Sequence, residues 1–167
     1  MCPDLGHALS NCHLAAKIMS TLLKKKRVYE IYEAFSAGNL DLLASALDEQ
    51  VDFVTNAPID VFPYLGRRLG RAAVLKALSD VHVEFESLTF LPIWMVVEND
   101  TVGAILSIHA TQRTTKRVLR FFAAHFLRFR DDRIVEFRSI MDSFEAVQQV
   151  LGREFDVVNF HNISLIG

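Results

Sequence analysis

A histidine and an aspartate lie near the two ends of the segment HFLRFRDDRIVEFRSIMDSFEAVQQVLG, residues 125–152. The pattern of this segment predicts a strand, a tight turn, a second strand and a helix. Imidazole and carboxylate groups are common carriers of protons in general acid–base catalysis. His125 and Asp142 are therefore the first candidates for an acid–base pair, and each of them also has a structural interpretation.

The neighbours of His125 predict that its side chain points into the protein. It shares one face of its predicted strand with apolar side chains, namely Leu119, Phe121, Ala123, Leu127 and Phe129. The opposite face carries Arg120, Arg128 and Arg130, and successive side chains of a strand point to opposite faces. Burial lowers the pKa of an imidazole toward a neutral form that can act as a base or as a donor. His125 is thus either a pocket residue or a core histidine bonded to a hydroxyl or carbonyl group.

Asp142 has a strong alternative role as a helix cap. The sequence Asp-Ser-Phe-Glu places Glu145 three residues after Asp142, which is the spacing of a capping box at the start of a helix. Such a cap accounts for the carboxylate without a catalytic role, and its removal typically costs about 1 kcal/mol. We therefore expect Asp142 to be structural and His125 to be the better candidate for a site.

The first half of the chain predicts helices. Apolar residues recur at helical spacing through residues 14–35, which indicates one long helix, or two helices joined near residues 24–27. Asn39 can cap a second short helix, LDLLASALD. The segment VDFVT predicts a short strand, and RAAVLKALSDV predicts a third helix.

The second half predicts strands and one last helix. The predicted strands are VEFESLTF, IWMVVEN, TVGAILSIHATQR, KRVLRFFAAHFLRFR and RIVEFRSIM. Turn signals separate them at residues 91–92, 99–100, 114–115 and 131–132. A final helix, SFEAVQQVLG, ends at Gly152. Helices followed by a curved antiparallel sheet predict an α+β fold, in which three helices cover one side of the bent sheet and enclose an apolar interior.

Composition and charge narrow the class of protein. The chain has 167 residues, of which 51% are hydrophobic, and this is typical of one globular domain. A net charge of −2 argues against a nucleic-acid partner. Cys2 and Cys12 are interpreted as free thiols, and the N-terminal segment has neither a basic leader nor a membrane-spanning run. We therefore expect a cytoplasmic protein without a membrane partner. The histidines at 82, 109 and 125 share no metal-binding spacing.

Three stretches of the sequence resemble a known family. They are YEAFSAGNLDLLASALDEQVDF, PYLGRRLGRAAVLKAL and the segment 125–152 already quoted. Together they resemble the SnoaL-like, ketosteroid-isomerase-like branch of the NTF2-like superfamily. The resemblance covers residues 27–152, so we expect an N-terminal helical extension over 1–26, a SnoaL-like domain over 27–152 and a C-terminal tail over 153–167.

The resemblance implies a conical α+β barrel that admits a small apolar molecule. It also implies a homodimer formed through the outer face of the sheet. The activities of the family include steroid isomerisation, polyketide cyclisation and dehydration, all without metal or cofactor. Some members are plain binding or dimerisation modules, so the fold alone does not imply a reaction.

The resemblance also suggests roles for individual residues. The place of the catalytic aspartate of ketosteroid isomerases, at the end of the first strand, holds Thr55 or Asn56. Neither can take a proton from carbon, so that isomerase chemistry is not expected. Tyr32 corresponds to a tyrosine that donates to the oxyanion, and His125 falls on the second oxyanion donor. Polyketide cyclases of the family use a histidine and an aspartate. His125 fits the place of the histidine well, whereas Asp142 fits the place of the aspartate poorly.

Two functions follow as hypotheses. In the first, the protein binds a small apolar molecule, with or without acid–base chemistry by His125 and Tyr32. Asn56 would then orient a carbonyl group, and four aromatic side chains would shape the pocket, namely Phe53, Trp94, Phe121 and Phe137. In the second, the protein is a non-catalytic dimerisation or protein-interaction module. A cavity of about 300 Å³ or more would favour the first function, and a filled interior would favour the second.

Overall fold

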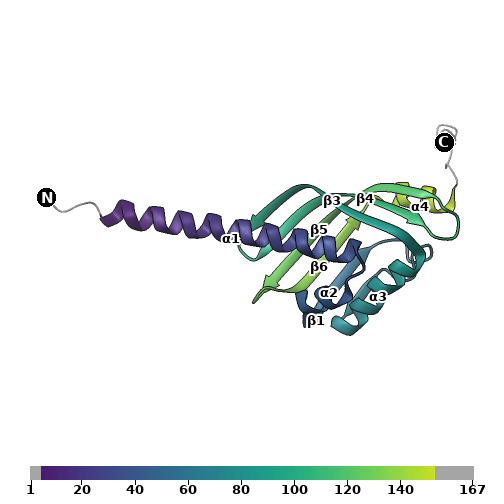
Figure 1. Ribbon diagram of the computed structural model, residues 1–167, viewed down its shortest axis with the longest axis horizontal. Coiled ribbons are helices and arrows are strands. Elements are labelled where there is room, and N and C mark those ends of the chain that lie inside the picture. Colours follow the sequence, from purple (N-terminus) through teal and green to yellow (C-terminus); the bar gives the residue numbers. More distant parts are fainter. Residues whose placement is uncertain (1–4, 153–167) are drawn as a thin grey trace, which may run out of the picture.

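The structure is a computed structural model that describes residues 5–152 (Figure 1). Its helices are α1 (Leu5–Ser36), α2 (Leu40–Ala46), α3 (Arg71–Glu84) and α4 (Ser143–Leu151). Its strands are β1 (Leu47–Asn56), β2 (Arg67–Leu69), β3 (Phe85–Glu98), β4 (Thr101–Gln112), β5 (Val118–Arg130) and β6 (Arg133–Met141). The predicted α+β class is confirmed.

The six strands form one curved, unclosed sheet in the order β2-β1-β6-β5-β4-β3. The three hairpins from β3 to β6 are antiparallel, as predicted. The expectation of a wholly antiparallel sheet is corrected, because β1 pairs with β6 in parallel and with the short β2 in antiparallel orientation. One helix and four strands separate β1 from β6 in the chain, which provides the long connection that a parallel neighbour requires.

The predicted break at residues 91–92 is not present. Strand β3 runs without interruption from Phe85 to Glu98, and its pairing with β4 shifts register between Pro92 and Trp94. A proline is tolerated in an edge strand or at a bulge because no ladder hydrogen bond from its nitrogen is needed there. The prediction of two strands was therefore wrong at this point.

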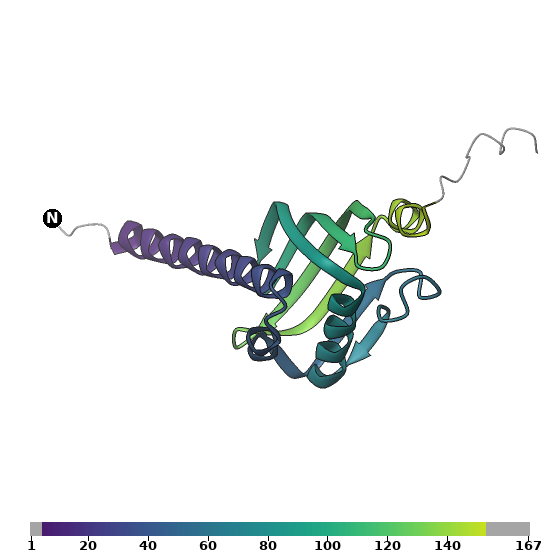
Figure 2. The same cartoon turned by 45° about the vertical axis from the view of Figure 1, so that its right-hand side comes forward.

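Helices α1, α2 and α3 lie on one side of the curved sheet (Figures 1 and 2). Asn39 caps α2 as predicted, because its Oδ1 accepts a hydrogen bond of 3.0 Å from the Leu42 amide. The core lies between these helices and the sheet, and Val102, Leu106 and Leu127 are fully buried in it. The alternation predicted for residues 101–112 is observed, since the even positions of β4 face the core.

The segment predicted as an N-terminal helical extension is helical from Leu5 onward. Helix α1 is continuous from Leu5 to Ser36, and its N-terminal half projects beyond the sheet (Figures 1 and 2). The predicted tail 153–167 lies outside the described residues. In the part of the chain that the structure describes, no helix is long and apolar enough to cross a membrane.

The outer face of the sheet carries cross-strand ion pairs. Arg128 Nη2 lies 2.7 Å from Glu136 Oε2, and Arg138 bridges Glu136 and Asp52 at 2.9 Å and 2.6 Å. Burial acts to raise the pKa of Asp52, but hydrogen bonds from Arg67 and Arg138 hold it below its usual value. The basic residues of β5 and β6 are thus largely paired with carboxylates on their own sheet.

Candidate active site

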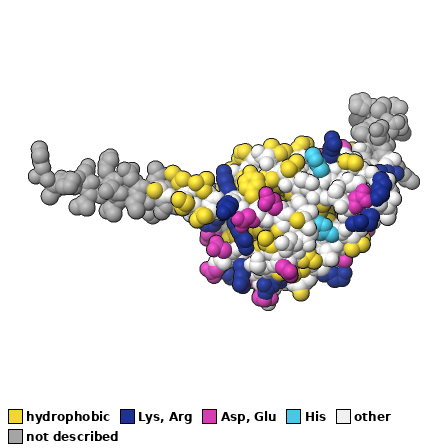
Figure 3. Space-filling model, viewed as in Figure 1, with side chains coloured by type: hydrophobic (Ala, Val, Ile, Leu, Met, Phe, Trp, Pro, Cys, Tyr) yellow, Lys and Arg dark blue, Asp and Glu magenta, His cyan; other side chains and the backbone are white. Residues whose placement is uncertain are grey.

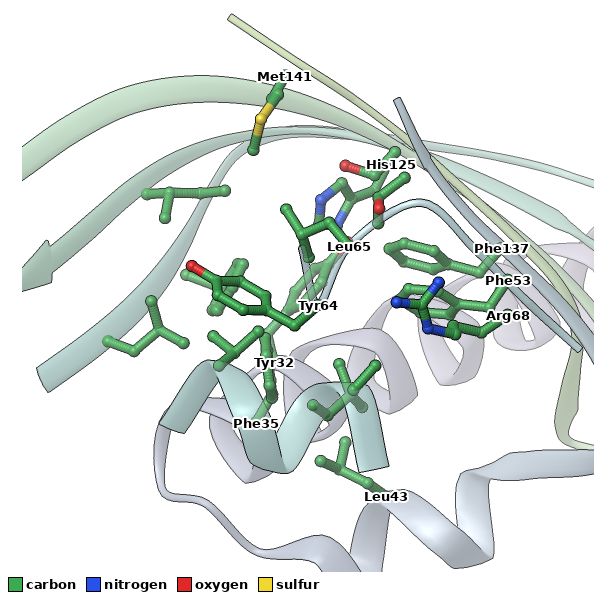
Figure 4. A pocket seen from close by; sticks show the side chains of 18 of the residues that line it. Tyr32, Phe35, Leu43, Phe53, Tyr64, Leu65, Arg68, His125, Phe137 and Met141 are labelled. Carbon is green, nitrogen blue, oxygen red and sulfur yellow. The ribbon is translucent and has the colours of Figure 1, made fainter. Parts of the chain in front are cut away.

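A cavity of about 140 Å³ lies between the helices and the inner face of the sheet (Figure 4). Its walls are predominantly apolar and come from α1–α3, from all six strands and from the 62–66 loop. The interior is therefore not filled by side chains, although the cavity is smaller than 300 Å³. An engineered cavity of about 150 Å³ with similar apolar walls holds benzene, so the space fits a molecule of about one ring.

Two polar side chains meet at the wall of this cavity. The Tyr32 hydroxyl, from α1, lies 3.2 Å from His125 Nδ1, from β5. Tyr32 is 4% exposed and His125 is 5% exposed, so the hydrogen bond is shielded from solvent. The residues are separated by 93 positions in the sequence, and only the packing of α1 across the sheet brings them together.

Burial keeps both groups in their neutral forms. It lowers the pKa of His125 to about 3 and raises the pKa of Tyr32 well above its usual value. At neutral pH, His125 is therefore an uncharged imidazole and Tyr32 keeps its phenolic proton. A base with a pKa near 3 is weak at pH 7, so the pair is better suited to hydrogen bonding than to proton abstraction.

The hydrogen bond between Tyr32 and His125 Nδ1 is compatible with either tautomer of the neutral imidazole, because a phenol can donate or accept. A neutral imidazole has one donor and one acceptor nitrogen. If the protonated phenol donates to Nδ1, the imidazole proton lies on Nε2. Among the described residues Nε2 has no hydrogen-bond partner, and no fully buried side-chain polar atom there is unpaired. Nε2 therefore borders the cavity, where it can donate to an acceptor atom of a ligand.

Aromatic rings fix the orientation of the imidazole. Phe137 meets the His125 ring edge-on with a centroid distance of 4.8 Å, and Phe53 stacks on Phe137 at 4.2 Å. Phe90 lies 6.2 Å from His125 and stacks on Tyr32 at 6.0 Å. Figure 4 shows Tyr32, His125, Phe53 and Phe137 grouped around the cavity. A rotation of the imidazole would require these rings to move.

A row of small polar residues crosses the inner face of the sheet beside His125. Ser139 of β6 is paired with His125, and Thr55 of β1 is paired with Ser139. The Thr55 hydroxyl donates to the Gly66 carbonyl at 3.2 Å and accepts from the Gly66 amide at 2.7 Å. Ser139 was not predicted as a site residue, although its odd position in RIVEFRSIM places it on the same face as the inward-facing Phe137.

Comparison with known proteins identifies the family of the chain. The family model of the SnoaL-like domain matches residues 28–137. The chain belongs to the SnoaL-like domain family. No curated protein matches it in sequence.

Solved structures share the fold of this SnoaL-like domain. A proposed isomerase from Rhodopseudomonas palustris is 26% identical, with a TM-score of 0.66 over 74% of this chain and 91% of that chain. IdmH, a proposed polyketide cyclase from Streptomyces antibioticus, is 22% identical, with a TM-score of 0.64 over 77% and 97% of the two chains. An LEH-like epoxide hydrolase from M. tuberculosis is 13% identical, with a TM-score of 0.66 over 80% and 92%. A proposed isomerase, a proposed polyketide cyclase and an epoxide hydrolase are thus among the proteins that share this architecture.

The SnoaL-like domain has most of the predicted pocket residues at the cavity wall. His125 and Tyr32 line it, and so do the predicted aromatic residues Phe53, Phe121 and Phe137. The phenylalanines reach the cavity because they occupy inward positions of β1, β5 and β6.

Three predicted residues lie outside the cavity. Asn56 is exposed because the alternation of β1 turns its neighbour Thr55 inward. Trp94 is 55% exposed on the outer face, since the register shift after Pro92 sets the direction of its side chain. Asp142 is exposed and caps α4, where its Oδ1 accepts a hydrogen bond of 3.2 Å from the Glu145 amide. None of the three is placed to contact a ligand in the cavity.

The cavity wall of the described chain carries one cation and no carboxylate. The Arg68 guanidinium is bound to backbone carbonyls, at 2.9 Å to Arg67 and at 3.1 Å to Pro63. Tyr64 also lines the cavity, and burial, together with the nearby Glu84, raises its pKa. Within residues 5–152, no group of acidic, histidine or cysteine side chains is arranged to hold a metal ion. The polar chemistry of this wall therefore centres on His125 and its neighbours.

Proposed function

We propose that the protein binds a small apolar molecule of about one ring that carries one hydrogen-bond acceptor, such as a carbonyl oxygen. The observation that carries this proposal is the buried Tyr32–His125 hydrogen bond at the wall of an otherwise apolar cavity. His125 Nε2–H would donate to the acceptor, and Tyr32 would hold the imidazole in this tautomer. Ser139, beside His125, is placed to make a second polar contact.

The catalytic part of the proposal is the polarisation of the bound carbonyl group. A neutral imidazole can act as an electrophile without a net charge, provided that its orientation is fixed in advance. Because the described wall lacks a carboxylate base, the catalytic proposal covers cyclisation, dehydration or isomerisation only of substrates whose proton transfers need no such base on the protein. Loss of such a hydrogen-bond donor typically lowers the rate by a factor of about 10²–10³. A His125→Ala protein with full activity on an identified substrate would contradict this catalytic role.

The binding proposal can be tested with two probes of nearly equal shape. Acetophenone carries a carbonyl group, whereas ethylbenzene does not, and titration calorimetry can compare them. We expect the wild type to prefer the ketone by about fivefold, since a hydrogen bond contributes about 1 kcal/mol. His125→Leu should remove the preference and retain ethylbenzene binding, which serves as the control for an intact cavity.

Other outcomes of this experiment have distinct meanings. Equal affinity of the wild type for both probes would show that Nε2 does not donate. Binding of neither probe would contradict the ligand-binding function and favour the non-catalytic interaction module. Tyr32→Phe separates the role of Tyr32, which holds the imidazole, from the role of His125, which donates to the ligand. The variant removes the partner of Nδ1 and leaves Nε2 in place.

We also propose that the protein forms a homodimer through the outer face of the sheet. Large apolar side chains are exposed on this face of β3, β4 and β5, namely Leu91, Trp94, Val96, Ile105, Phe122 and Phe126. The strand register makes them neighbours, since Trp94 pairs with Ile105 and Ser107 lies between Leu91 and Phe122. Apolar patches of this kind typically mark protein interfaces.

The dimer has a direct test in sedimentation velocity. The double variant Trp94→Glu/Phe122→Glu should halve the mass of the particle without unfolding it, because both side chains are more than half exposed. Ile59→Glu, at a similarly exposed residue in the loop after β1, is the matched control and should leave the mass unchanged. A monomeric wild type at all concentrations would contradict the proposal.

A further inference from the structure

The two halves of helix α1 bury opposite sides. Val28, Ile31 and Tyr32 pack into the core and are 0%, 6% and 4% exposed. Nine residues before each of them lie Met19, Leu22 and Leu23, which are 58%, 57% and 59% exposed. Nine residues make about two and a half helical turns, so the members of each pair point in opposite directions.

The projecting half of α1 therefore has an exposed apolar stripe that is not buried against its own sheet. The stripe consists of Ile18, Met19, Leu22 and Leu23, and each of these side chains is more than half exposed. The side of the helix that continues the sheet-facing row is polar here, with Thr21 and Lys24 at that position. In Figure 3, hydrophobic side chains gather on the projecting helix, next to basic side chains where the helix reaches the body. The fold of this domain does not use the stripe.

The charge of the same segment points to an anionic partner. Between Leu5 and Tyr29 the sequence has no Asp or Glu, and its basic residues are Lys17, Lys24, Lys25, Lys26 and Arg27. Lys24 pairs with Asp100 at 3.5 Å, and Lys26 and Arg27 pair with Glu30 at 3.8 Å and 3.6 Å. Such partly exposed pairs are weak. Asp100 and Glu30, together with Asp132 across the neighbouring hollow, are still fewer than the five cations. The segment remains positive although the whole chain has a net charge of −2.

These two properties together identify the partner as a lipid surface. We propose that the projecting half of α1 lies on an anionic membrane surface, with its apolar stripe in the headgroup region and its basic residues near the lipid phosphates. A helix with exposed apolar residues on one side and lysines at its border is suited to this position. Met19 and Leu23 border an open hollow together with Phe129 and Asp132 of the body, so the β5–β6 turn would lie beside the helix, close to the membrane surface.

Charge and size argue against a second copy of α1 as the partner. Two parallel copies would bring their basic runs together, and the helices would repel each other in either direction because neither brings acidic residues before Glu30. Four side chains over about two turns are also far fewer than the 20–30 residues that each side of a stable interface contributes. A membrane surface needs neither an acidic helix nor a large complementary area.

The proposal revises the expectation that the protein has no membrane partner. That expectation followed from the overall composition and from the lack of a spanning segment, whereas the basic and apolar residues are concentrated in one projecting helix. A helix that lies on the surface needs no spanning segment, so the proposal agrees with the finding for the described helices. It is independent of the cavity, which lies between the helices and the inner face of the sheet.

Flotation with lipid vesicles tests the proposal on the full chain. We expect the protein to float with phosphatidylcholine vesicles that contain phosphatidylserine, and not with vesicles of phosphatidylcholine alone. Binding should weaken as salt is raised, because the attraction between exposed charges is screened. Equal binding to both kinds of vesicle, or no binding to either, would overturn the proposal.

Two pairs of variants separate the apolar and basic contributions. Ile18→Ser/Leu22→Ser should weaken vesicle binding about tenfold or more, whereas Ile59→Ser/Val83→Ser, at equally exposed apolar residues of the body, should not. Lys25→Gln/Lys26→Gln should weaken binding about 25-fold, at about fivefold for each basic residue. Lys76→Gln/Arg133→Gln is its control on the body.

A helix-mediated dimer is the outcome that would replace this proposal. In that case Ile18→Ser/Leu22→Ser would halve the particle mass in sedimentation velocity without lipid, and vesicle binding would be absent. If the proposal is correct, the same variant keeps the mass of the wild type and loses only vesicle binding. Circular dichroism confirms that the helix content is retained in each variant.

Discussion

The two faces of strand β5 use similar residues for different purposes. On the inner face, His125 and Leu127 are buried against the helices and the cavity. On the outer face, the intervening Phe126 is 47% exposed and has Arg128 as its next neighbour on that side. Phe126 and Leu127 are both large and apolar, so residue type does not distinguish them. Their positions in the alternation of the strand decide which one belongs to the core.

The sharpest test of this contrast compares two neighbouring substitutions. Leu127→Ala should lower the free energy of unfolding by about 2–5 kcal/mol, because it leaves a cavity at a fully buried position. Phe126→Ala should change the free energy of unfolding of the monomer by less than about 0.5 kcal/mol. Urea denaturation at a low protein concentration measures both. A similar loss for the two variants would mean that the outer face is covered within the monomer.

The buried imidazole of the inner face predicts a dependence of stability on pH. The pKa of His125 is about 3 in the folded protein and near the ordinary 6.5 in the unfolded chain. Between these values the unfolded chain binds a proton that the folded protein does not. The free energy of unfolding should therefore fall by about 1.4 kcal/mol for each pH unit as the pH is lowered through this window. Denaturation curves at several pH values measure the slope.

A variant without the imidazole provides the control for this slope. In His125→Leu, the slope of the free energy of unfolding against pH should be smaller by the contribution of one proton between the two pKa values. Asp52 acts in a lower range, because its folded pKa lies below its ordinary 3.8 and its stabilising effect is lost as the pH falls below that value. An unchanged slope in His125→Leu would show that the imidazole is not held neutral.

Asp142 is an exposed polar residue, and its substitution can be compared with the substitution of the buried His125. Asp142→Ala should lower the free energy of unfolding by about 1 kcal/mol, because the Glu145 amide loses its hydrogen-bond partner. It should leave the affinity for acetophenone unchanged, since Asp142 lies outside the cavity. Asp142→Asn retains a capping oxygen and is the conservative control. A loss of ligand affinity in Asp142→Ala would return this residue to the site.

The smallest effect is expected from the ion pairs of the outer face. A double-mutant cycle with Arg128→Ala and Glu136→Ala should give a coupling energy of about 0.2–1 kcal/mol, because Arg128 is exposed. High salt should reduce it further. A coupling of several kcal/mol would indicate that this face is buried, as it would be at the proposed dimer interface.

Local patterns predicted most of the fold. The helical spacing before Gly38, the alternation of residues 101–112 and the capping residues Asn39 and Asp142 each reflect interactions between near neighbours in the chain. The parallel pairing of β1 with β6 was not predicted, because it depends on packing between distant segments. Pro92 was misinterpreted as a turn. A strand tolerates a proline when it lies at the edge of the sheet, and the local sequence does not reveal which strand lies there.

The candidate site was predicted in part for the same reason. Alternation places His125 on the inner face and helical spacing places Tyr32 on the buried side, but their contact depends on how α1 crosses the sheet. The interpretation of Trp94 failed because a one-residue register shift between Pro92 and Trp94 determines its direction. Ser139 had an inward position but no distinctive chemistry, so only its pairing with His125 draws attention to it.

The edge of the sheet at β3 has one further consequence. A strand of 14 residues at the end of a sheet is a template on which another chain can add itself and start aggregation. Pro92 lacks a backbone donor, and the register shift beside it interrupts the regular spacing of the edge. An incoming strand would therefore find no continuous ladder to copy. This residue protects the folded protein from unwanted polymerisation at its longest strand.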